Sequence, residues 1–282
     1  MSPKSKVRKK PVKHRDPRAQ ARQAAYEAAR TSARRKWGLA ALLVTVVLIF
    51  GATQVFDVGG GDKSTVDSSS DTTVASTIVA APVSLPTPAK GASIAGDTPC
   101  PATDGSSART TAFAKAPPTC IVTGKTYEAD VQTSKGLVTV ALDAAAAPKT
   151  VNNFVVLARY HYFDTLPFHR IVTGFVVQGG SPDASGAGSP GYTFADELPR
   201  AGAYKVGTVA MANSGPNTNG SQFFIVVGDA ASLAPSYSIF GEVSAGIDVV
   251  QAIAAAGTPA TDPNAGKPTE VVTIQSVTIK ES

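Results

Sequence analysis

The sequence has few of the residues that build metal sites and disulfide frameworks. Its 282 residues include two cysteines, three histidines and one tryptophan. Two cysteines are too few for a small disulfide-built domain or for the usual structural zinc sites. The histidines, His14, His161 and His169, do not have the spacing of a metal-binding cluster. We therefore expect a protein that uses no metal and no cofactor.

Motifs for nucleophilic catalysis and nucleotide binding are also missing. There is no G-x-S-x-G elbow, and no pair of acid and base stands out. Residues 186–191 match G-x-G-x-x-G, but Pro190 and the residues after it do not begin a helix on a phosphate. Residues 215–220 have the spacing of a phosphate-binding loop, but Ser221 stands where its lysine is required. We interpret both matches as chance features of glycine-rich loops.

Charge is unevenly distributed along the chain. The formal net charge is +5, from 26 basic and 21 acidic residues. Residues 1–36 hold 13 of the basic residues and two acids, so this tail carries +11, and the remaining 246 residues carry −6. This distribution excludes a basic globular nucleic-acid-binding domain and leaves at most a basic tail.

An uncharged apolar segment follows the tail. Residues 37–56 form 20 residues without a charge, and a helix of that length rises about 30 Å, the thickness of a bilayer's hydrocarbon core. Because Arg34, Arg35 and Lys36 precede it, the positive-inside rule places the N-terminus in the cytoplasm. We expect a signal anchor that holds a single-pass protein in the cell membrane, with its catalytic domain outside the cytoplasm. The alternatives are a cleaved signal peptide and a buried globular helix.

The segments flanking this expected anchor have their own roles. We expect the basic tail, residues 1–36, to lie against anionic lipid, while binding to nucleic acid is the less favoured alternative. Residues 57–98 are rich in Ser, Thr, Pro and Ala, and no aromatic residue occurs between Phe56 and Phe113. This composition predicts a flexible linker.

Residues 99–125 form an extension that contains both cysteines. Cys100 and Cys120 fall on the predicted outer side of the membrane, where an oxidising compartment favours disulfides. A disulfide between them would close a loop of about 20 residues and contribute ~3 kcal/mol through loop-closure entropy. Two free thiols are the alternative.

Residues 126–282 have the pattern of one mainly β domain. Alternating segments on either side of 134–136 predict a hairpin over residues 131–142. Apolar residues at helical spacing predict one helix after Pro148 and another that begins near Ile247, for which Gly257 is a candidate C-cap. Strands are expected within residues 175–177, 206–211, 223–227, 239–243 and 270–279. Many short strands with two helices favour a helix-capped barrel.

Two long segments of this domain resemble the signature motifs of the cyclophilins, a family of peptidyl-prolyl cis-trans isomerases. They are FHRIVTGFVVQGG at 168–180 and MANSGPNTNGSQFFI at 211–225, and the strand at 240–243 is also similar. The resemblance covers about residues 126–282. It implies an eight-stranded antiparallel β-barrel capped by two α-helices, with an active site on an outer face and a monomeric catalytic domain.

The resemblance also implies roles for individual residues. Arg170 matches the catalytic arginine of the family. The positions that match substrate-binding residues are Phe175, Val176, Gln178, Ala212, Asn213, Gln222, Phe224, Leu233 and Tyr237. Three positions depart from the common pattern. Val176 replaces the commoner Met, and Tyr237 stands where the best-known members have His and many bacterial ones have Tyr. Ser232 stands where a Trp often borders the pocket, and Ser232 and Val176 put cyclosporin affinity in doubt more than catalysis.

Isomerisation of X-Pro bonds requires no nucleophile. Rotation faces a barrier of about 18–20 kcal/mol because the amide is conjugated. Catalysis needs a pocket for the proline ring, donors and acceptors that hold the flanking backbone, and a cation directed at the prolyl nitrogen. We expect the substrates to be proline-containing, unfolded or exported polypeptides. Two other functions remain open: a non-catalytic peptide-binding or chaperone module on the same scaffold, and an adaptor that acts through the basic tail. On residue pattern alone, Arg170 could also be an ion-pair partner, and Phe175 and Phe224 could be ordinary core.

Overall fold

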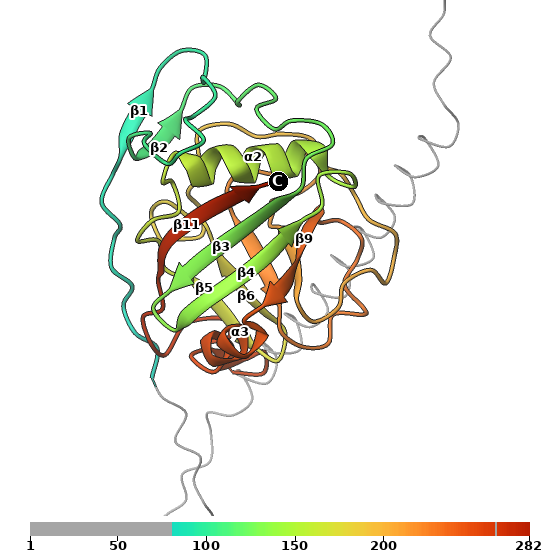
Figure 1. Ribbon diagram of the computed structural model, residues 1–282. Coiled ribbons are helices and arrows are strands. Elements are labelled where there is room, and N and C mark those ends of the chain that lie inside the picture. The colour runs from blue at the N-terminus through green and yellow to red at the C-terminus, as the bar shows by residue number, and fades with distance from the viewer. Residues whose placement is uncertain (1–80, 263) are drawn as a thin grey trace, which may run out of the picture. The chain divides into compact units, whose positions relative to one another are not determined.

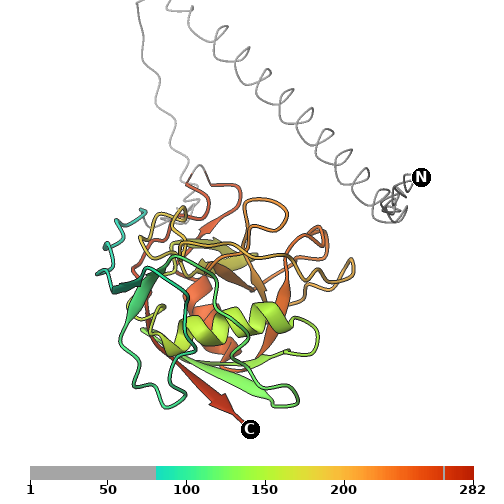
Figure 2. The ribbon, with the colours of Figure 1, turned by 90° about the horizontal axis from the view of Figure 1, so that it is seen from above.

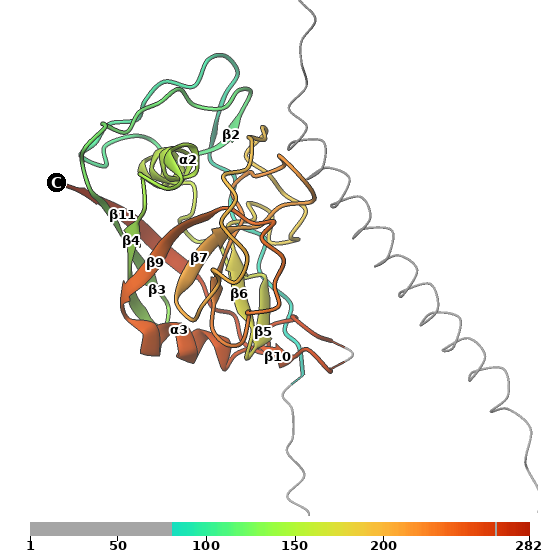
Figure 3. The same ribbon diagram turned by 90° about the vertical axis from the view of Figure 1, so that its right-hand side faces the viewer.

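The computed structural model describes residues 81–262 and 264–282. Within these residues nine strands form one sheet in the order β10-β5-β6-β8-β7-β9-β4-β3-β11, and two further strands, β1 and β2, pair separately. The sheet curls so that β3, β4, β9 and β11 form one side and β5, β6 and β7 face them (Figure 1, Figure 3). The expected anchor at 37–56, the basic tail and most of the expected linker lie outside the described residues.

The strands of the sheet are short and almost all antiparallel. Their bounds are β3 (Tyr127–Thr133), β4 (Gly136–Leu142), β5 (Arg170–Thr173), β6 (Val176–Gly179), β7 (Thr208–Met211), β8 (Phe223–Val226), β9 (Ile239–Ala245), β10 (Thr258–Pro259) and β11 (Ile274–Glu281). The predicted hairpin is confirmed, since β3 and β4 pair from Tyr127–Leu142 to Thr133–Gly136. The last strand begins at Ile274, four residues later than the sequence pattern indicates.

Two helices lie at opposite openings of the curled sheet (Figure 3). Helix α2 (Pro148–Arg159) begins with proline in its first turn, as predicted, and turns Val151, Phe154 and Val155 into the core. Helix α3 (Ile247–Ala254) buries Val250, Ile253 and Ala254. Helix α2 therefore buries its expected apolar stripe, and α3 buries its own except for Ile247, which is 41% exposed.

Gly257 is not the C-cap of α3. The helix ends at Ala254, and the cap residue is Ala255 in a right-handed conformation. Gly257 instead lies against β5, where a Cβ atom would stand 2.6 Å from the carbonyl oxygen of Ile171. Close approach of two backbones, and not a left-handed turn, therefore requires glycine at this position.

The expectation of an eight-stranded antiparallel barrel needs correction. Eight strands pair antiparallel, but a ninth, the two-residue β10, adds to β5 in parallel. The sheet is a curled half-barrel whose strand order ends at β10 and β11. The backbone nitrogen of Phe168 donates to the Val272 oxygen at 2.9 Å, and that of Ile274 donates to the Leu166 oxygen at 2.8 Å. These bonds join the segments that precede β5 and β11 across the opening.

The residues before the domain pack against it. Strand β1 (Ala92–Ile94) pairs in parallel with β2 (Thr110–Phe113), and both lie near α2 (Figure 1, Figure 2). Part of the range 57–98 that the sequence indicates as linker is therefore folded. Low hydrophobicity misled the prediction, because this segment is held largely by backbone hydrogen bonds such as Ala92 nitrogen to Arg109 oxygen at 2.8 Å.

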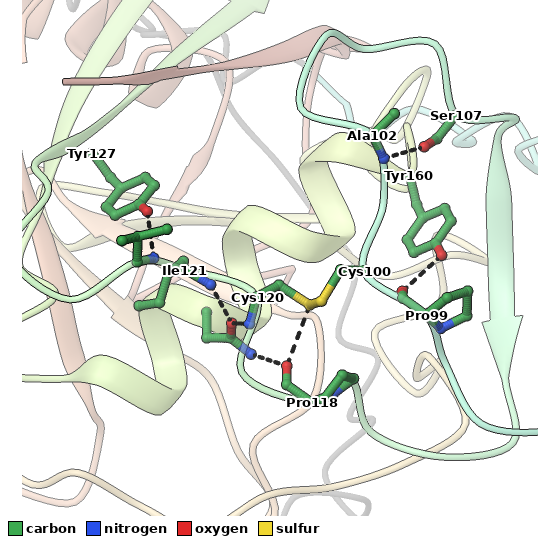
Figure 4. Close-up of a disulfide and its surroundings, with 11 residues drawn as sticks. Pro99, Cys100, Ala102, Ser107, Pro118, Cys120, Ile121, Tyr127 and Tyr160 are labelled. Carbon is green, nitrogen blue, oxygen red and sulfur yellow. Dashed lines mark hydrogen bonds between the residues drawn. A yellow bond between two sulfur atoms is a disulfide. The ribbon is translucent and has the colours of Figure 1, made fainter.

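Cys100 and Cys120 form a disulfide, as expected, with their Cα atoms 5.5 Å apart (Figure 4). The backbone nitrogen of Cys120 donates to Oδ1 of Asn152 on α2 at 2.6 Å, and Nδ2 of Asn152 donates to the Pro118 oxygen at 2.9 Å. The hydroxyl of Tyr160, just after α2, donates to the Pro99 oxygen at 2.9 Å. Both ends of the disulfide loop are thus bound to α2 or to the residue that follows it.

The described helices include none that is both long and apolar enough to cross a membrane.

Candidate active site

Strand register places the expected catalytic arginine on the same face as the expected pocket. Arg170 of β5 pairs with Gln178 of β6, Gln178 pairs with Phe224 of β8, and Phe224 pairs with Ala210 of β7. Directly paired residues project to the same side of a sheet. Four strands therefore carry one row of side chains, from Arg170 to Ala210, across the outer face.

Neighbouring residues on these strands face opposite sides of the sheet. Phe223 belongs to the main core, where its ring packs edge-on against Phe154 with centroids 5.6 Å apart. Phe224 belongs to a separate apolar cluster, and Val177 and Val176 divide in the same way. Phe224 therefore lies outside the main core, although it is buried in this second cluster. Both faces of β8 are buried, which explains its unbroken apolar sequence.

The second cluster, which we call the outer cluster, contains the expected proline-pocket residues. Its members are Val176, Tyr204, Ala210, Phe224, Val226 and Ala230, with Phe175, Ala212, Leu233, Tyr237 and Ile239 packed against them. Phe224 and Tyr237 meet edge to face, with ring centroids 5.5 Å apart and an interplanar angle of 87°. An apolar cluster with aromatic members offers contacts that suit a compact ring such as that of proline.

A chain of amides leads from Arg170 to a glycine-rich loop. Nη1 of Arg170 lies 3.5 Å from Oε1 of Gln178, and Nε2 of Gln178 donates to Oε1 of Gln222 at 3.1 Å. Nε2 of Gln222 then donates to the carbonyl oxygens of Gly186 and Gly188 at 2.9 and 3.0 Å. The loop that the sequence indicated only as a chance motif match therefore belongs to the site.

A cavity of about 310 Å³ adjoins this amide chain. Gln178, Ala212, Asn213 and Gln222 line it, so the four residues expected to hold the substrate backbone are brought together. Nδ2 of Asn213 donates to the Ser236 oxygen at 2.8 Å, which ties the cavity wall to the loop that carries Tyr237.

Arg170 is half-buried, and its hydrogen-bond partner in the described structure is the neutral Gln178. It forms no ion pair with any described acid, so the alternative of a structural ion-pair partner is not supported. Burial lowers the pKa of its guanidinium, and the nearby Tyr237 opposes this shift. An arginine still stays protonated at neutral pH, so the site holds an uncompensated cation.

Gly266 lies directly against the Arg170 side chain. A Cβ atom on this glycine would stand 3.0 Å from Cγ of Arg170, and its φ of 81° lies in the left-handed region. The Gly266 oxygen also accepts a hydrogen bond from the Ile171 nitrogen at 2.9 Å. The absence of a side chain at 266 thus leaves space for the stem of Arg170.

His169 precedes Arg170 and has a buried imidazole ring. Within the described structure neither ring nitrogen has a hydrogen-bond partner. Burial and the neighbouring Arg170 lower the pKa of this imidazole to about 4, against weaker opposing effects of Asp183 and Gln222. His169 is therefore neutral near pH 7.

Sequence reasoning missed Tyr204, which is 3% exposed and belongs to the outer cluster. The only signal for it was an isolated aromatic residue in an Ala- and Gly-rich segment before a strand.

A larger cavity of about 760 Å³ lies elsewhere, between residues 116–125 of the extension and the first half of α2. None of the ten expected catalytic and substrate-binding residues lines it. We place the active site at the outer cluster and its adjoining cavity because the cation, the amides and the aromatic walls converge there.

The fold and this site define a class: a mainly β protein whose curled sheet carries an apolar cluster and a row of amides on its outer face. Comparison with known proteins narrows the class. Residues 128–279 match the family described as cyclophilin type peptidyl-prolyl cis-trans isomerase/CLD, so the chain belongs to that family.

Curated relatives agree with this assignment. The chain is 44% identical over 170 residues to peptidyl-prolyl cis-trans isomerase B of Streptomyces anulatus. This match covers 54% of this chain and 95% of that protein. It is 44% identical over 167 residues to a probable peptidyl-prolyl cis-trans isomerase A of Mycobacterium leprae. This match covers 54% of this chain and 91% of the relative. The protein is accordingly a peptidyl-prolyl cis-trans isomerase.

Solved structures are similar as well. A cyclophilin-type isomerase of Cryptosporidium parvum matches with a TM-score of 0.50 and 30% identity, over 55% of this chain and 98% of that one. A second crystal structure of the same protein was determined in the presence of the dipeptide Ala-Pro, with the same TM-score and identity.

Proposed function

We propose that Arg170 accelerates X-Pro isomerisation by stabilising the twisted prolyl amide. As the C–N bond loses conjugation, the prolyl nitrogen becomes pyramidal and gains a lone pair that can accept a hydrogen bond. The guanidinium of Arg170, half-buried beside Gln178, would donate that hydrogen bond. The observation that carries this proposal is the register row that sets Arg170 beside Gln178 and Phe224 on one face.

The other site residues hold the substrate. The proline ring enters the outer cluster against Phe175, Val176, Phe224, Leu233 and Tyr237. Gln178, Ala212, Asn213 and Gln222 bind the flanking backbone, since they line the adjoining cavity. The Ala-Pro dipeptide used with the Cryptosporidium parvum relative supports proline-containing peptides as the substrate class. No bond is made or broken in this mechanism, so positioning and one cation suffice.

The direct test is an isomerisation assay on the full-length protein, with a proline peptide whose trans form is cleaved by a coupled protease. We expect Arg170→Ala to lower kcat/KM by about 10²-fold or more, the scale of losing one preorganised donor. The exposed Arg200 provides a matched control, and Arg200→Ala should retain activity within about twofold. Equal activity of wild type and Arg170→Ala would refute the proposed role of Arg170.

The same protein distinguishes the enzyme from a non-catalytic binding module. Titration with a proline peptide, followed by NMR, reports binding and cis-trans exchange together. Binding without faster exchange in the wild-type protein would favour the peptide-binding or chaperone alternative.

We further propose that the enzyme acts outside the cytoplasm, anchored by residues 37–56, on unfolded or newly exported polypeptides. The supporting observations are the +11 tail before an uncharged apolar segment and the Cys100–Cys120 disulfide, which suits an oxidising compartment. Membrane fractionation tests the anchor, and protease treatment of intact cells tests the topology. Recovery of the full-length protein in the soluble cytoplasmic fraction would contradict both predictions.

A further inference from the structure

We propose that Tyr204 is a positioning residue that holds Tyr237 in the wall of the proline pocket. This inference rests on the proposed function of the outer cluster. It assigns a role to a residue outside the two signature segments, on a loop that precedes β7.

The two tyrosines are joined by a reciprocal pair of hydrogen bonds. The hydroxyl of Tyr204 donates to the backbone oxygen of Tyr237 at 2.8 Å. The same hydroxyl oxygen accepts a bond from the backbone nitrogen of Tyr237 at 3.1 Å. A tyrosine hydroxyl has one proton to donate and lone pairs to accept, so one group satisfies both backbone polar groups of Tyr237.

The adjoining residues of the loop are held by other partners. Asn213 binds the Ser236 oxygen through Nδ2 at 2.8 Å, and the Met211 nitrogen donates to the Ser238 oxygen at 2.9 Å. Tyr204 supplies the contacts at the residue between them. Residues 236–238 therefore each form a hydrogen bond with β7 or with a segment next to it.

The backbone that follows Tyr204 forms a tight hydrogen-bonded turn before β7. The backbone nitrogen of Lys205 donates to the Thr208 hydroxyl at 3.1 Å, and the Thr208 nitrogen donates to the Lys205 oxygen at 2.9 Å. This tight turn connects Tyr204 to β7. Tyr204 is 3% exposed and packs within the outer cluster, so its side chain has little freedom to move.

The orientation of Tyr237 matters because its ring completes the aromatic wall. It stands edge-on to Phe224 with ring centroids 5.5 Å apart. Without the Tyr204 hydroxyl, the Tyr237 peptide groups lose their bonds in a partly buried loop, and the ring loses its fixed position. The pocket would then hold the proline ring less tightly in both the ground state and the transition state.

The test replaces the hydroxyl and keeps the ring. Tyr204→Phe should raise KM for a proline peptide about tenfold and change kcat less than about twofold, because binding is weakened uniformly. The control is Tyr160→Phe, which removes the bond to the Pro99 oxygen from a tyrosine that is also buried, at 6% exposure. This control should leave KM within about twofold of wild type. NMR exchange measurements over a range of peptide concentrations separate KM from kcat.

An unchanged KM in Tyr204→Phe would overturn the inference, as would an equal rise in Tyr160→Phe. A change confined to thermal stability would also count against it. If wild type shows no isomerase activity, the proposed function fails, and that result is distinct from a failure of Tyr204.

A second measurement applies even if Tyr204→Phe does not fold. Amide hydrogen exchange of wild type should show the Tyr237 amide protected at least about tenfold relative to an unstructured peptide. Exchange of this amide at the unstructured rate would overturn the inference without any variant. In a folded Tyr204→Phe protein, protection should fall at Tyr237 and persist at the Met211 amide, which donates to Ser238.

Discussion

Nε2 of Gln178 donates a hydrogen bond to Oε1 of Gln222 at 3.1 Å, and this contact orients both side chains. The amide nitrogen of Gln222 is already used by the carbonyls of Gly186 and Gly188, so its oxygen is free to accept from Gln178. Gln178 consequently presents its own oxygen toward Arg170 at 3.5 Å. A loop 36 residues before Gln222 in sequence thus helps to determine where the Arg170 guanidinium lies.

We predict that Gln178 and Gln222 act as a coupled pair. Gln178→Ala and Gln222→Ala should each lower kcat/KM about tenfold, because each removes a link between Arg170 and the 186–188 loop. The double variant should lose less than the product of the two effects, with a coupling of about 1 kcal/mol.

Gln251 provides a control for this comparison of single and double variants, which forms a double-mutant cycle. Its Nε2 donates to the Val227 oxygen at 3.0 Å, at α3 and away from the row of site residues. Combining Gln178→Ala with Gln251→Ala should give additive effects on kcat/KM. Additivity in both cycles would contradict the predicted coupling.

The disulfide should contribute stability. The sequence separation of 20 between Cys100 and Cys120 corresponds to ~3 kcal/mol of loop-closure entropy. We expect Cys100→Ser, Cys120→Ser and the double variant to lose a similar free energy of unfolding, measured by urea denaturation. Addition of a thiol reductant to wild type should reproduce the loss. Identical unfolding midpoints for wild type and the double variant would disprove this prediction.

Stability should fall with acidification through His169. Its pKa is about 4 in the folded protein against about 6.5 in an unfolded chain, so between these values the unfolded state binds more protons. The contribution of neutral His169 is therefore complete above about pH 6.5 and is lost as the pH falls toward 4, by at most about 3 kcal/mol.

Urea unfolding of wild type and His169→Gln at pH 7 and pH 4.5 isolates this effect. The difference in unfolding free energy between the two pH values should be smaller in His169→Gln, which cannot take up the proton. The same pH dependence in both proteins would show that His169 does not contribute.

Helix α2 receives its N-terminal cap from a distant loop. No side chain of the cap residue Ala147 binds the first turn. The Glu197 carboxylate instead accepts bonds from the backbone nitrogens of Lys149 and Thr150 at 3.1 and 2.9 Å, and from the Thr150 hydroxyl at 2.8 Å. A carboxylate at this position also complements the helix dipole.

Glu197→Ala should therefore lower the free energy of unfolding by about 1–2 kcal/mol, as measured by chemical denaturation. Glu270→Ala is the matched control, since Glu270 is more than half exposed and pairs only with Lys135 among the described bases. Its removal should cost less than about 0.5 kcal/mol. Equal losses in the two variants would contradict a capping role.

Local patterns predicted the parts of the fold that local forces determine. The turn at 134–136 and the alternation around it predicted β3 and β4, and helical spacing predicted α2 and α3, because side-chain periodicity follows directly from backbone geometry. The family resemblance allowed Arg170 and the nine substrate-binding residues to be named, and the structure brings all ten to one face. Their individual roles stay predictions.

Contacts between distant residues were decided only by the tertiary structure. The division of Phe223 and Phe224 between two apolar clusters depends on register across four strands, which no short window of sequence contains. Tyr204 hydrogen-bonds with Tyr237, which lies 33 residues later in the sequence. Glu197 caps helix α2 through Thr150, which lies 47 residues earlier. The sequence by itself determined the family motifs, the elements with clear periodicity and the pair of cysteines. Packing of the folded chain decided which side chains hold the active site in place, because those contacts exist only when separate strands and loops meet.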